Sequence, residues 1–179
     1  MRVARWPAAE PIASPRLDLE PLRVAHAAEM VAVLGDPQLY EFTGGRPPSE
    51  SELVDRYTRQ VLGESVDGRQ GWLNWILRVR DSRAAIGTVQ ATLRDDDAGE
   101  RRAELAWVLS TRFQGAGYAT EGAAAVIEWL RGEGVESVEA FIQPSHGASA
   151  RVAQRLGLEP TGEMRGGETR WILRTRCHN

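Results

Sequence analysis

The feature that most constrains this chain is the stretch of residues 103–130. Residues 103–109 are almost wholly apolar, which is typical of a short buried strand. Glycine and alanine predominate over residues 115–119 and indicate a tight turn. From Thr120 onward the apolar residues recur at i, i+3, i+4 and i+7, a spacing that predicts one face of a helix, and Gly132 follows as an end signal. The sequence therefore predicts a strand, a tight turn and a helix.

A turn of this kind can receive an anion. The first N–H groups of a helix have no partner within the helix, and the helix dipole adds partial positive charge there. Two known phosphate motifs do not fit: a P-loop needs a lysine, and all 22 basic residues are arginine. A Rossmann fingerprint needs Gly or Ala at position 120, where Thr120 stands. The remaining readings are a different phosphate loop or a turn whose glycines only ease packing.

The loop pattern Gln114-x-x-Gly117-x-Ala119 resembles the acetyl-CoA pyrophosphate loop of the GNAT superfamily of N-acetyltransferases. The run at residues 118–121 is similar to the branch of ribosomal-protein N-terminal acetyltransferases, the RimJ/RimL type. The resemblance covers residues 16–174, nearly the whole chain. It implies a GNAT fold, in which helices flank a central mixed α/β sheet with two splayed strands. It also implies acetyl-CoA as the cosubstrate.

A second matching segment is His146-x-x-Ser149-x-Arg151, followed by a Leu-Gly pair. This branch of the family has Asn where His146 stands and an aromatic residue where Leu158 stands. The family Asn hydrogen-bonds the pantetheine arm, and a neutral histidine has one donor fewer for that role. His146 can equally be a residue that only begins a helix.

The family binds its cofactor where the central strand and the strand at residues 136–142 splay apart. Many relatives protonate the leaving thiolate with a tyrosine, but Ala153 stands at that position. The resemblance implies that Ser149 serves instead as the acid or as a positioning partner of the sulfur. The residues expected to bind the cofactor are Trp107, Val108, Leu109, Gln114, Gly115, Ala116, Gly117, Tyr118, Ala119, Thr120, His146, Ser149 and Arg151.

Acetyl transfer to an amine needs a neutral amine and a donor for the thioester oxygen as charge develops on it. Backbone N–H groups near residues 107–109 are the expected donor. Glu104 on the central strand is the first candidate for the general base, because relatives often place a carboxylate there. Glu41 is the substitute, and Glu104 can equally be a solvent-facing sheet residue.

The acceptor side is expected at the loop of residues 38–48, between two predicted helices. Tyr40, Glu41 and Phe42 are the candidate substrate contacts, although the aromatic rings can equally pack in the core with Glu41 in solvent. Trp72 and Trp75 are separated by an odd number of residues, so they cannot share one face of a strand. We expect one of them, Trp75, to reach the acceptor.

The rest of the chain predicts the order β-α-α-β-β-β-α-β-α-β-β. Residues 1–15 contain three prolines and are expected to form an extended lead-in to a single domain at residues 16–176. The predicted helices lie at residues 24–34, 49–62, 120–130 and 147–156. The predicted strands lie at residues 16–22, 72–80, 84–93, 103–109, 136–142, 158–163 and 168–174.

Composition excludes several classes of protein. With 179 residues, 42% hydrophobic and 26% charged, the chain is expected to be one globular domain. A net charge of −3 argues against nucleic-acid binding through bulk charge. The lone Cys177 indicates a reducing compartment, and we expect a cytoplasmic protein without a secretory signal, spanning helix or disulfide framework. The histidines have no ligand spacing and the run at residues 94–100 is typical of a solvated hairpin, so no metal is expected.

The sequence thus predicts an enzyme that moves an acetyl group from acetyl-CoA to a primary amine by direct attack in a ternary complex. The acceptor is expected to be a protein N-terminus, or alternatively a small molecule such as an antibiotic. A CoA-binding module without catalysis stays open, as does a nucleotide-binding regulatory domain. We expect a monomer or a homodimer.

Overall fold

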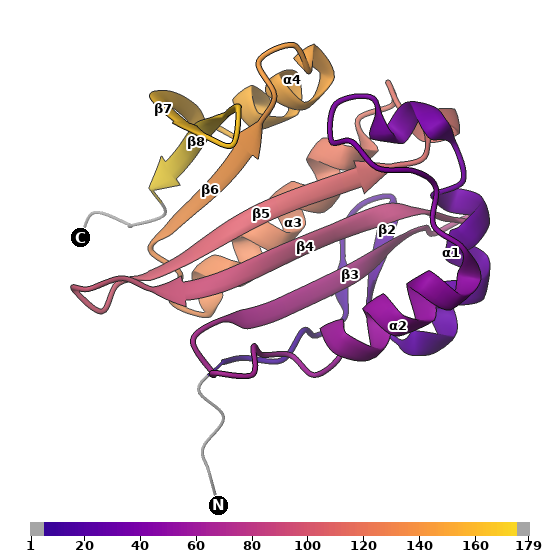
Figure 1. Ribbon diagram of the computed structural model, residues 1–179, viewed down its shortest axis with the longest axis horizontal. Coiled ribbons are helices and arrows are strands. Elements are labelled where there is room, and N and C mark those ends of the chain that lie inside the picture. Colours follow the sequence, from indigo (N-terminus) through magenta and orange to yellow (C-terminus); the bar gives the residue numbers. More distant parts are fainter. Residues whose placement is uncertain (1–5, 175–179) are drawn as a thin grey trace, which may run out of the picture.

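The apolar strand of residues 103–109 lies inside an eight-stranded mixed sheet (Figure 1). The computed structural model describes residues 6–174. The strand order is β1-β2-β3-β4-β5-β6-β8-β7, and every neighbouring pair is antiparallel except β5 and β6. The strands are β1 (Ile12–Ala13), β2 (Leu17–Pro21), β3 (Gly71–Val79), β4 (Ala85–Asp95), β5 (Arg101–Leu109), β6 (Ser137–Ile142), β7 (Glu159–Arg165) and β8 (Glu168–Arg174).

The helices lie on both faces of this sheet, with α3 behind it and α2 in front of it in Figure 1. Within residues 6–174, no helix is long and apolar enough to cross a membrane. The α-helices are α1 (Ala27–Val33), α2 (Glu50–Gln60), α3 (Tyr118–Gly132) and α4 (Gly147–Arg155). The 3₁₀ turns are η1 (Val24–His26), η2 (Pro37–Tyr40) and η3 (Thr111–Phe113).

The two faces of the sheet have separate hydrophobic cores. Along β3, Leu73, Trp75 and Leu77 belong to the core under α3, whereas Ile76 belongs to the core under α1 and α2. This division follows from the alternation of side chains along a strand. On the α2 face, β3, β4 and β5 also carry polar side chains that border a cavity, among them Asn74, Gln90 and Glu104.

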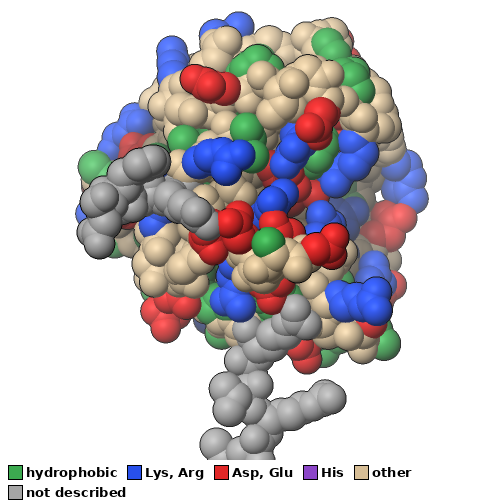
Figure 2. Space-filling view, turned by 90° about the vertical axis from the view of Figure 1, so that its left-hand side faces the viewer, with side chains coloured by type: hydrophobic (Ala, Val, Ile, Leu, Met, Phe, Trp, Pro, Cys, Tyr) green, Lys and Arg blue, Asp and Glu red, His purple; other side chains and the backbone are tan. Residues whose placement is uncertain are grey.

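The structure agrees with the predicted order and adds detail at the element ends. The predicted helix of residues 24–34 is a 3₁₀ turn followed by α1, and the predicted lead-in contains the short strand β1. Strands β4 and β5 extend further into the charged run than predicted, because ion pairs such as Arg101–Asp95 (3.2 Å) join their ends. Figure 2 views this end of the molecule, where basic and acidic side chains are interleaved.

The parting of β5 and β6 is the feature that positions the site. The two parallel strands are paired only from Arg102–Ser137 to Glu104–Glu139. Beyond Glu104, β5 remains paired with β4 as far as Leu109, whereas β6 remains paired with β8. The later halves of β5 and β6 therefore border an opening in the middle of a continuous sheet.

Gly87 on β4 lies against the part of β5 that borders this opening. A Cβ at position 87 would lie 2.2 Å from the Val108 carbonyl oxygen and 3.0 Å from Leu109 Cα. We therefore expect Gly87→Ala to lower the free energy of unfolding by about 3 kcal/mol, since the clash is with backbone. Urea denaturation measures this change. Gly132→Ala is the control, because a Cβ there meets nothing within 4 Å and is expected to be neutral or stabilising.

Candidate functional site

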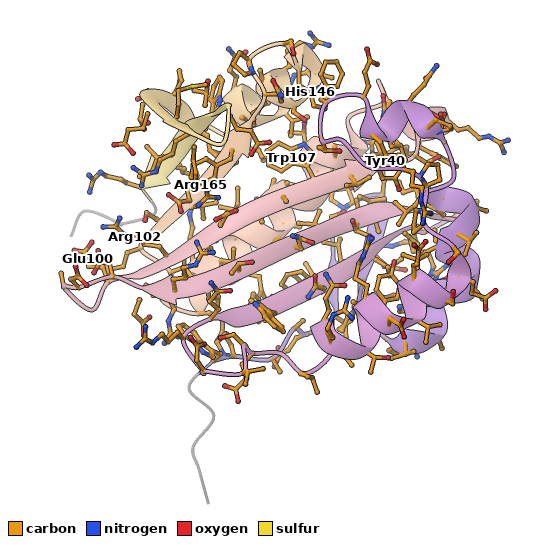
Figure 3. All side chains as sticks on the ribbon, viewed as in Figure 1. Tyr40, Glu100, Arg102, Trp107, His146 and Arg165 are labelled. Carbon is orange, nitrogen blue, oxygen red and sulfur yellow. The ribbon has the colours of Figure 1, made fainter. Side chains whose placement is uncertain are left out.

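The opening between β5 and β6 belongs to a cavity of about 680 Å³. The loop of residues 38–43, the end of β5, the start of α3, the end of β6 and the first turns of α4 border it. Figure 3 shows Tyr40, Trp107 and His146, from three of these segments, around the same end of β5. Every residue that the sequence predicted to bind the cofactor borders the cavity except Ala116, and so do Tyr40, Glu41, Phe42 and Glu104.

The turn between β5 and α3 has the geometry of an anion cradle. Gly117 is the N-cap of α3 with φ of 83°, and Gly115 has φ of 81°, both in the left-handed region that favours glycine. The amide Nε2 of Gln114 donates to the Leu109 carbonyl oxygen at 3.0 Å and ties the turn to the end of β5. The free N–H groups of the first turn of α3 therefore lie at the border of the cavity.

An ion pair supports this turn from the N-terminal side. Arg16 Nη1 donates to the Ala116 carbonyl oxygen at 2.9 Å, and Arg16 Nε lies 2.6 Å from Glu121 Oε2. The Ser14 hydroxyl donates to Glu121 Oε1 at 2.7 Å. Ala116 does not border the cavity, and its carbonyl is bound to Arg16, so this residue supports the turn; a cofactor contact at Ala116 stays a prediction.

The free edge of β5 presents backbone donors to the opening. Ser110 N donates to the Ile86 carbonyl oxygen at 2.8 Å, so this N–H points toward β4. Because N–H directions alternate along a strand, the N–H groups of Trp107 and Leu109 point the other way, toward the departing β6. Their direction agrees with the predicted place of an oxyanion donor.

Helix α4 brings two unpaired polar groups and two cations to the cavity. No hydrogen bond of the Ser149 hydroxyl is formed within residues 6–174, and the buried His146 Nδ1 has no partner there either. Arg151 and Arg155 form no ion pair with the described residues, and both border the cavity. Arg155 was not predicted from the sequence, although it follows Arg151 by four residues and so shares its helix face.

The predicted acceptor loop is anchored at both of its ends. Thr111 Oγ1 donates to Asp36 Oδ2 at 2.6 Å, and Asp36 also caps η2 by accepting from Gln38 N at 2.9 Å. At the other end the Phe42 ring is stacked on the His146 ring, with centroids 4.2 Å apart and planes at 17°. The loop therefore connects the end of β5 with the start of α4.

His146 is expected to make stability depend on pH. Burial lowers the pKa of His146, Arg151 lowers it further, and Glu41 opposes both. The unfolded chain therefore takes up the proton first as the pH falls below about 6.5, and this contribution to stability is lost below that pH. We expect His146→Asn to lose less stability than the wild type between pH 7.5 and 5.5 in urea denaturation. An equal loss in both proteins would contradict the prediction. Burial lowers the pKa of His26 too, but His26 is present in both proteins and so contributes equally to both slopes.

Three carboxylates border the cavity beside the opening. Glu104 Oε2 lies 3.1 Å from Arg94 Nη1, and Glu104 Oε1 lies 2.8 Å from Arg165 Nη2. Figure 3 shows Arg165 reaching over from β7, and its guanidinium stacks 3.5 Å from the Phe141 ring centroid. Neither Glu41 nor Glu168 forms a hydrogen bond or ion pair through its side chain within residues 6–174.

Trp75 is the predicted substrate contact that the structure does not support. Its side chain is 0% exposed, and the indole Nε1 donates to the Glu10 carbonyl oxygen at 2.8 Å. The ring also packs edge-on against Trp129 of α3 at 5.5 Å. Although Trp75 borders the cavity, its ring is part of the core under α3, where Leu73 and Leu77 also point.

Sequence reasoning missed a group of polar side chains that also border the cavity. They come from α2, β3 and β4, and no motif marks them. Their signal is the spacing i, i+4 on α2 and the polar positions of β3 and β4. They are Arg56, Tyr57, Gln60, Asn74 and Gln90.

No group of three or more metal-ligating side chains is found in the part of the chain that the structure describes. The charged run ends in a turn that Asp96 stabilises by accepting from Ala98 N and Glu100 N, each at 2.9 Å. Arg102 pairs with the same carboxylate. Cys177 and His178 lie outside the described residues.

A parallel strand pair that splays beside a left-handed glycine turn is the arrangement that the resemblance to the GNAT fold predicted. The profile of the acetyltransferase (GNAT) domain family matches residues 16–159. The chain belongs to this family and is an acetyl-CoA-dependent N-acetyltransferase. No curated protein sequence matches the chain significantly.

Solved structures with the same fold include other acetyltransferases. A GNAT-family acetyltransferase from Bacillus anthracis has a TM-score of 0.73 and 16% identity, covering 93% of this chain and 99% of that one. RimL, a ribosomal L7/L12 alpha-N-protein acetyltransferase in complex with coenzyme A, has 0.75 and 17%, covering 92% and 98%. The microcin C7 self-immunity acetyltransferase MccE, in complex with acetyl-CoA and AMP, has 0.72 and 15%, covering 89% and 93%.

Proposed function

We propose that this enzyme transfers an acetyl group from acetyl-CoA to the N-terminal amine of a protein or peptide, by direct attack in a ternary complex. The observation that carries the proposal is the parting of β5 and β6 beyond Glu104, next to the left-handed turn at Gly117. Bound acetyl-CoA would supply the thioester that the amine attacks.

Different groups around the cavity suit the phosphates, the thioester oxygen and the proton of the amine. Arg151, Arg155 and the first turn of α3 are suited to the phosphates of coenzyme A. The N–H groups of Trp107 and Leu109 would stabilise the thioester oxygen as negative charge develops on it. The carboxylate of Glu104 would accept the proton that the attacking amine loses.

Ser149 supports the leaving group in this proposal. Its hydroxyl borders the cavity and is free of partners within residues 6–174, so it can donate to the departing sulfur. A hydroxyl is a weak acid, and we therefore assign Ser149 the role of orienting the thiolate while water supplies the proton. The reaction forms the amide C–N bond and breaks the thioester C–S bond, with no covalent intermediate on the protein.

The polar side chains of β3, β4 and β5 that border the cavity favour an extended acceptor over a small one; they are Asn74, Thr88, Gln90 and Glu104. Release of free thiol from acetyl-CoA, followed with a panel of peptides and a panel of small amines, tests this proposal. Turnover with peptides and not with small amines supports it. Turnover confined to small amines would assign the enzyme to small-molecule acetylation, and coenzyme A binding without any turnover would indicate a binding module.

A further inference from the structure

The side of the cavity formed by α2, β3 and β4 carries polar side chains without partners. Arg56 and Gln60 are four residues apart and share one face of α2. Asn74 and Gln90 are directly opposite each other in the register of β3 and β4. None of these four side chains forms a hydrogen bond or an ion pair within residues 6–174, and all four border the cavity.

Tyr57 adds an independent sign that a ligand belongs here. The residue is only 3% exposed and packs in the core under α1 and α2, yet its hydroxyl is buried without a partner among the described residues. Burial raises the pKa of Tyr57 to about 12, against a smaller lowering by Arg56, so the hydroxyl stays protonated and donates. A buried donor without an acceptor is costly, and an oxygen atom of a ligand would satisfy it.

The carboxylates and the α2 cation border the cavity from different elements. Glu104 and Glu168 belong to β5 and β8, beside the opening where the amine would meet the thioester, and Glu41 belongs to the acceptor loop. Arg56 is the cation that borders the cavity on the α2 side, whereas Arg151 and Arg155 both belong to α4. An acceptor with its amine among the carboxylates would therefore place its other end near a guanidinium.

The sheet register gives the distance between the two sides. Asn74, Gln90 and Ala106 are adjacent across β3, β4 and β5. Strands lie roughly 4.8 Å apart, so Asn74 on β3 is about 10 Å from the edge of β5 where the thioester would bind, and Tyr57 packs in the same core as Ile76 of β3. An extended peptide covers roughly 3.3–3.6 Å per residue, so this distance corresponds to two or three residues and not to a single amino acid.

We propose that Arg56 and Tyr57 bind a carboxylate on the second or third residue of the acceptor, so that the enzyme prefers acidic peptide N-termini. The amide side chains of Asn74 and Gln90 would pair with the intervening peptide groups, because an amide both donates and accepts. This inference rests on the proposed peptide acceptor and specifies its sequence preference. It makes Arg56 a specificity-determining residue and leaves the acetyl-transfer step to the β5 side.

Tripeptide amides with aspartate, asparagine or lysine at the second or third residue test the inference. The C-terminal amide removes the only other carboxylate. We expect kcat/KM of the wild type to be about tenfold higher for aspartate than for asparagine, mainly through KM, as for a charge-assisted hydrogen bond. Arg56→Glu is expected to abolish this preference and to favour lysine instead. A preference for aspartate that survives in Arg56→Glu would overturn the inference.

Arg59→Glu is the matched control, because Arg59 lies on the exposed surface of the same helix and does not border the cavity. It is expected to keep the wild-type preference. Tyr57→Phe is expected to raise KM for the aspartate peptide several-fold without lowering stability, since the hydroxyl has no partner to lose. A merely structural role for Tyr57 would instead lower the thermal midpoint and leave the ratio between peptides unchanged.

Equilibrium binding of the same peptides to the protein with coenzyme A separates this inference from the proposed function. Turnover of all the peptides without a charge preference overturns the inference alone. Arg56-dependent binding of the aspartate peptide without turnover supports the inference and contradicts the proposed catalysis. Neither binding nor turnover of any peptide overturns both.

Discussion

Replacing Gly117 by glutamate is expected to weaken coenzyme A binding about 100-fold. The residue has φ of 83° at the N-cap of α3, a conformation that costs a side-chain-bearing residue roughly 1–2 kcal/mol. A Cβ there would also lie 3.5 Å from Arg16 Nη2, which supports the same turn. The added carboxylate would stand where we propose that the phosphates bind and would repel them. Calorimetric titration with coenzyme A measures the loss of affinity. Gly117→Ala, which adds the backbone strain without the charge, is expected to weaken binding about tenfold.

Gly134→Glu is the matched control for this change. Gly134 follows α3, has φ of 77° and meets nothing within 4 Å, so the substitution imposes a similar backbone strain and the same charge far from the turn. Coenzyme A binding is expected to stay within about twofold of the wild type. If both variants lost affinity equally while remaining folded, the turn at Gly117 would not be the anion site.

The strand, turn and helix of residues 103–132 were predictable because their signals are local. An apolar run, a change of period and glycines at a turn are each determined within a few residues. The same holds for α2, where Ser49 accepts from Glu52 N and Glu52 accepts from Ser49 N, as the S-x-x-E pattern indicates. The residues that the family resemblance named for the cofactor all border the cavity except Ala116.

The acceptor side was harder to predict because it depends on which strands lie next to one another. Gln90 and Asn74 become neighbours only through the β3–β4 register, and Arg56 borders the same cavity from α2. No local pattern encodes such a meeting. For Trp75, Leu73 and Leu77 alternate with it along the strand and already indicated a position of its ring in the core.

Glu104 marks the boundary between the paired part of β5 and β6 and the opening beyond it. It lies at the last paired position of β5 and β6, and arginines from β4 and β7 contact its two oxygens. Each carboxylate oxygen has two acceptor sites, so one site on each remains for an amine or a bridging water. The arginines hold the carboxylate at the start of the opening, which is where the proposed mechanism requires the attacking amine to lose its proton.

We therefore expect Glu104→Gln to lower turnover by about 100- to 1,000-fold, as loss of a general base commonly does, with coenzyme A affinity unchanged. Single-turnover kinetics with a peptide acceptor and calorimetry with coenzyme A measure the two quantities. The amide keeps one acceptor oxygen for an arginine but takes up a proton poorly, so the loss should be in the chemical step. Arg94 and Arg165 are partly exposed, and their weakened pairing should cost only about 1 kcal/mol of stability.

Glu139→Gln is the control that separates base catalysis from charge pairing. Glu139 is opposite Glu104 in the parallel register, pairs with Arg170 at 2.7 Å, and does not border the cavity. Both substitutions remove one carboxylate from neighbouring ion pairs on one face of the sheet, so an electrostatic or structural effect would lower turnover equally in both. A loss confined to Glu104→Gln assigns the proton transfer to that residue. If Glu104→Gln retained more than a tenth of the wild-type turnover, the unpaired Glu41 and Glu168 would be the carboxylates to replace next, because they border the same cavity.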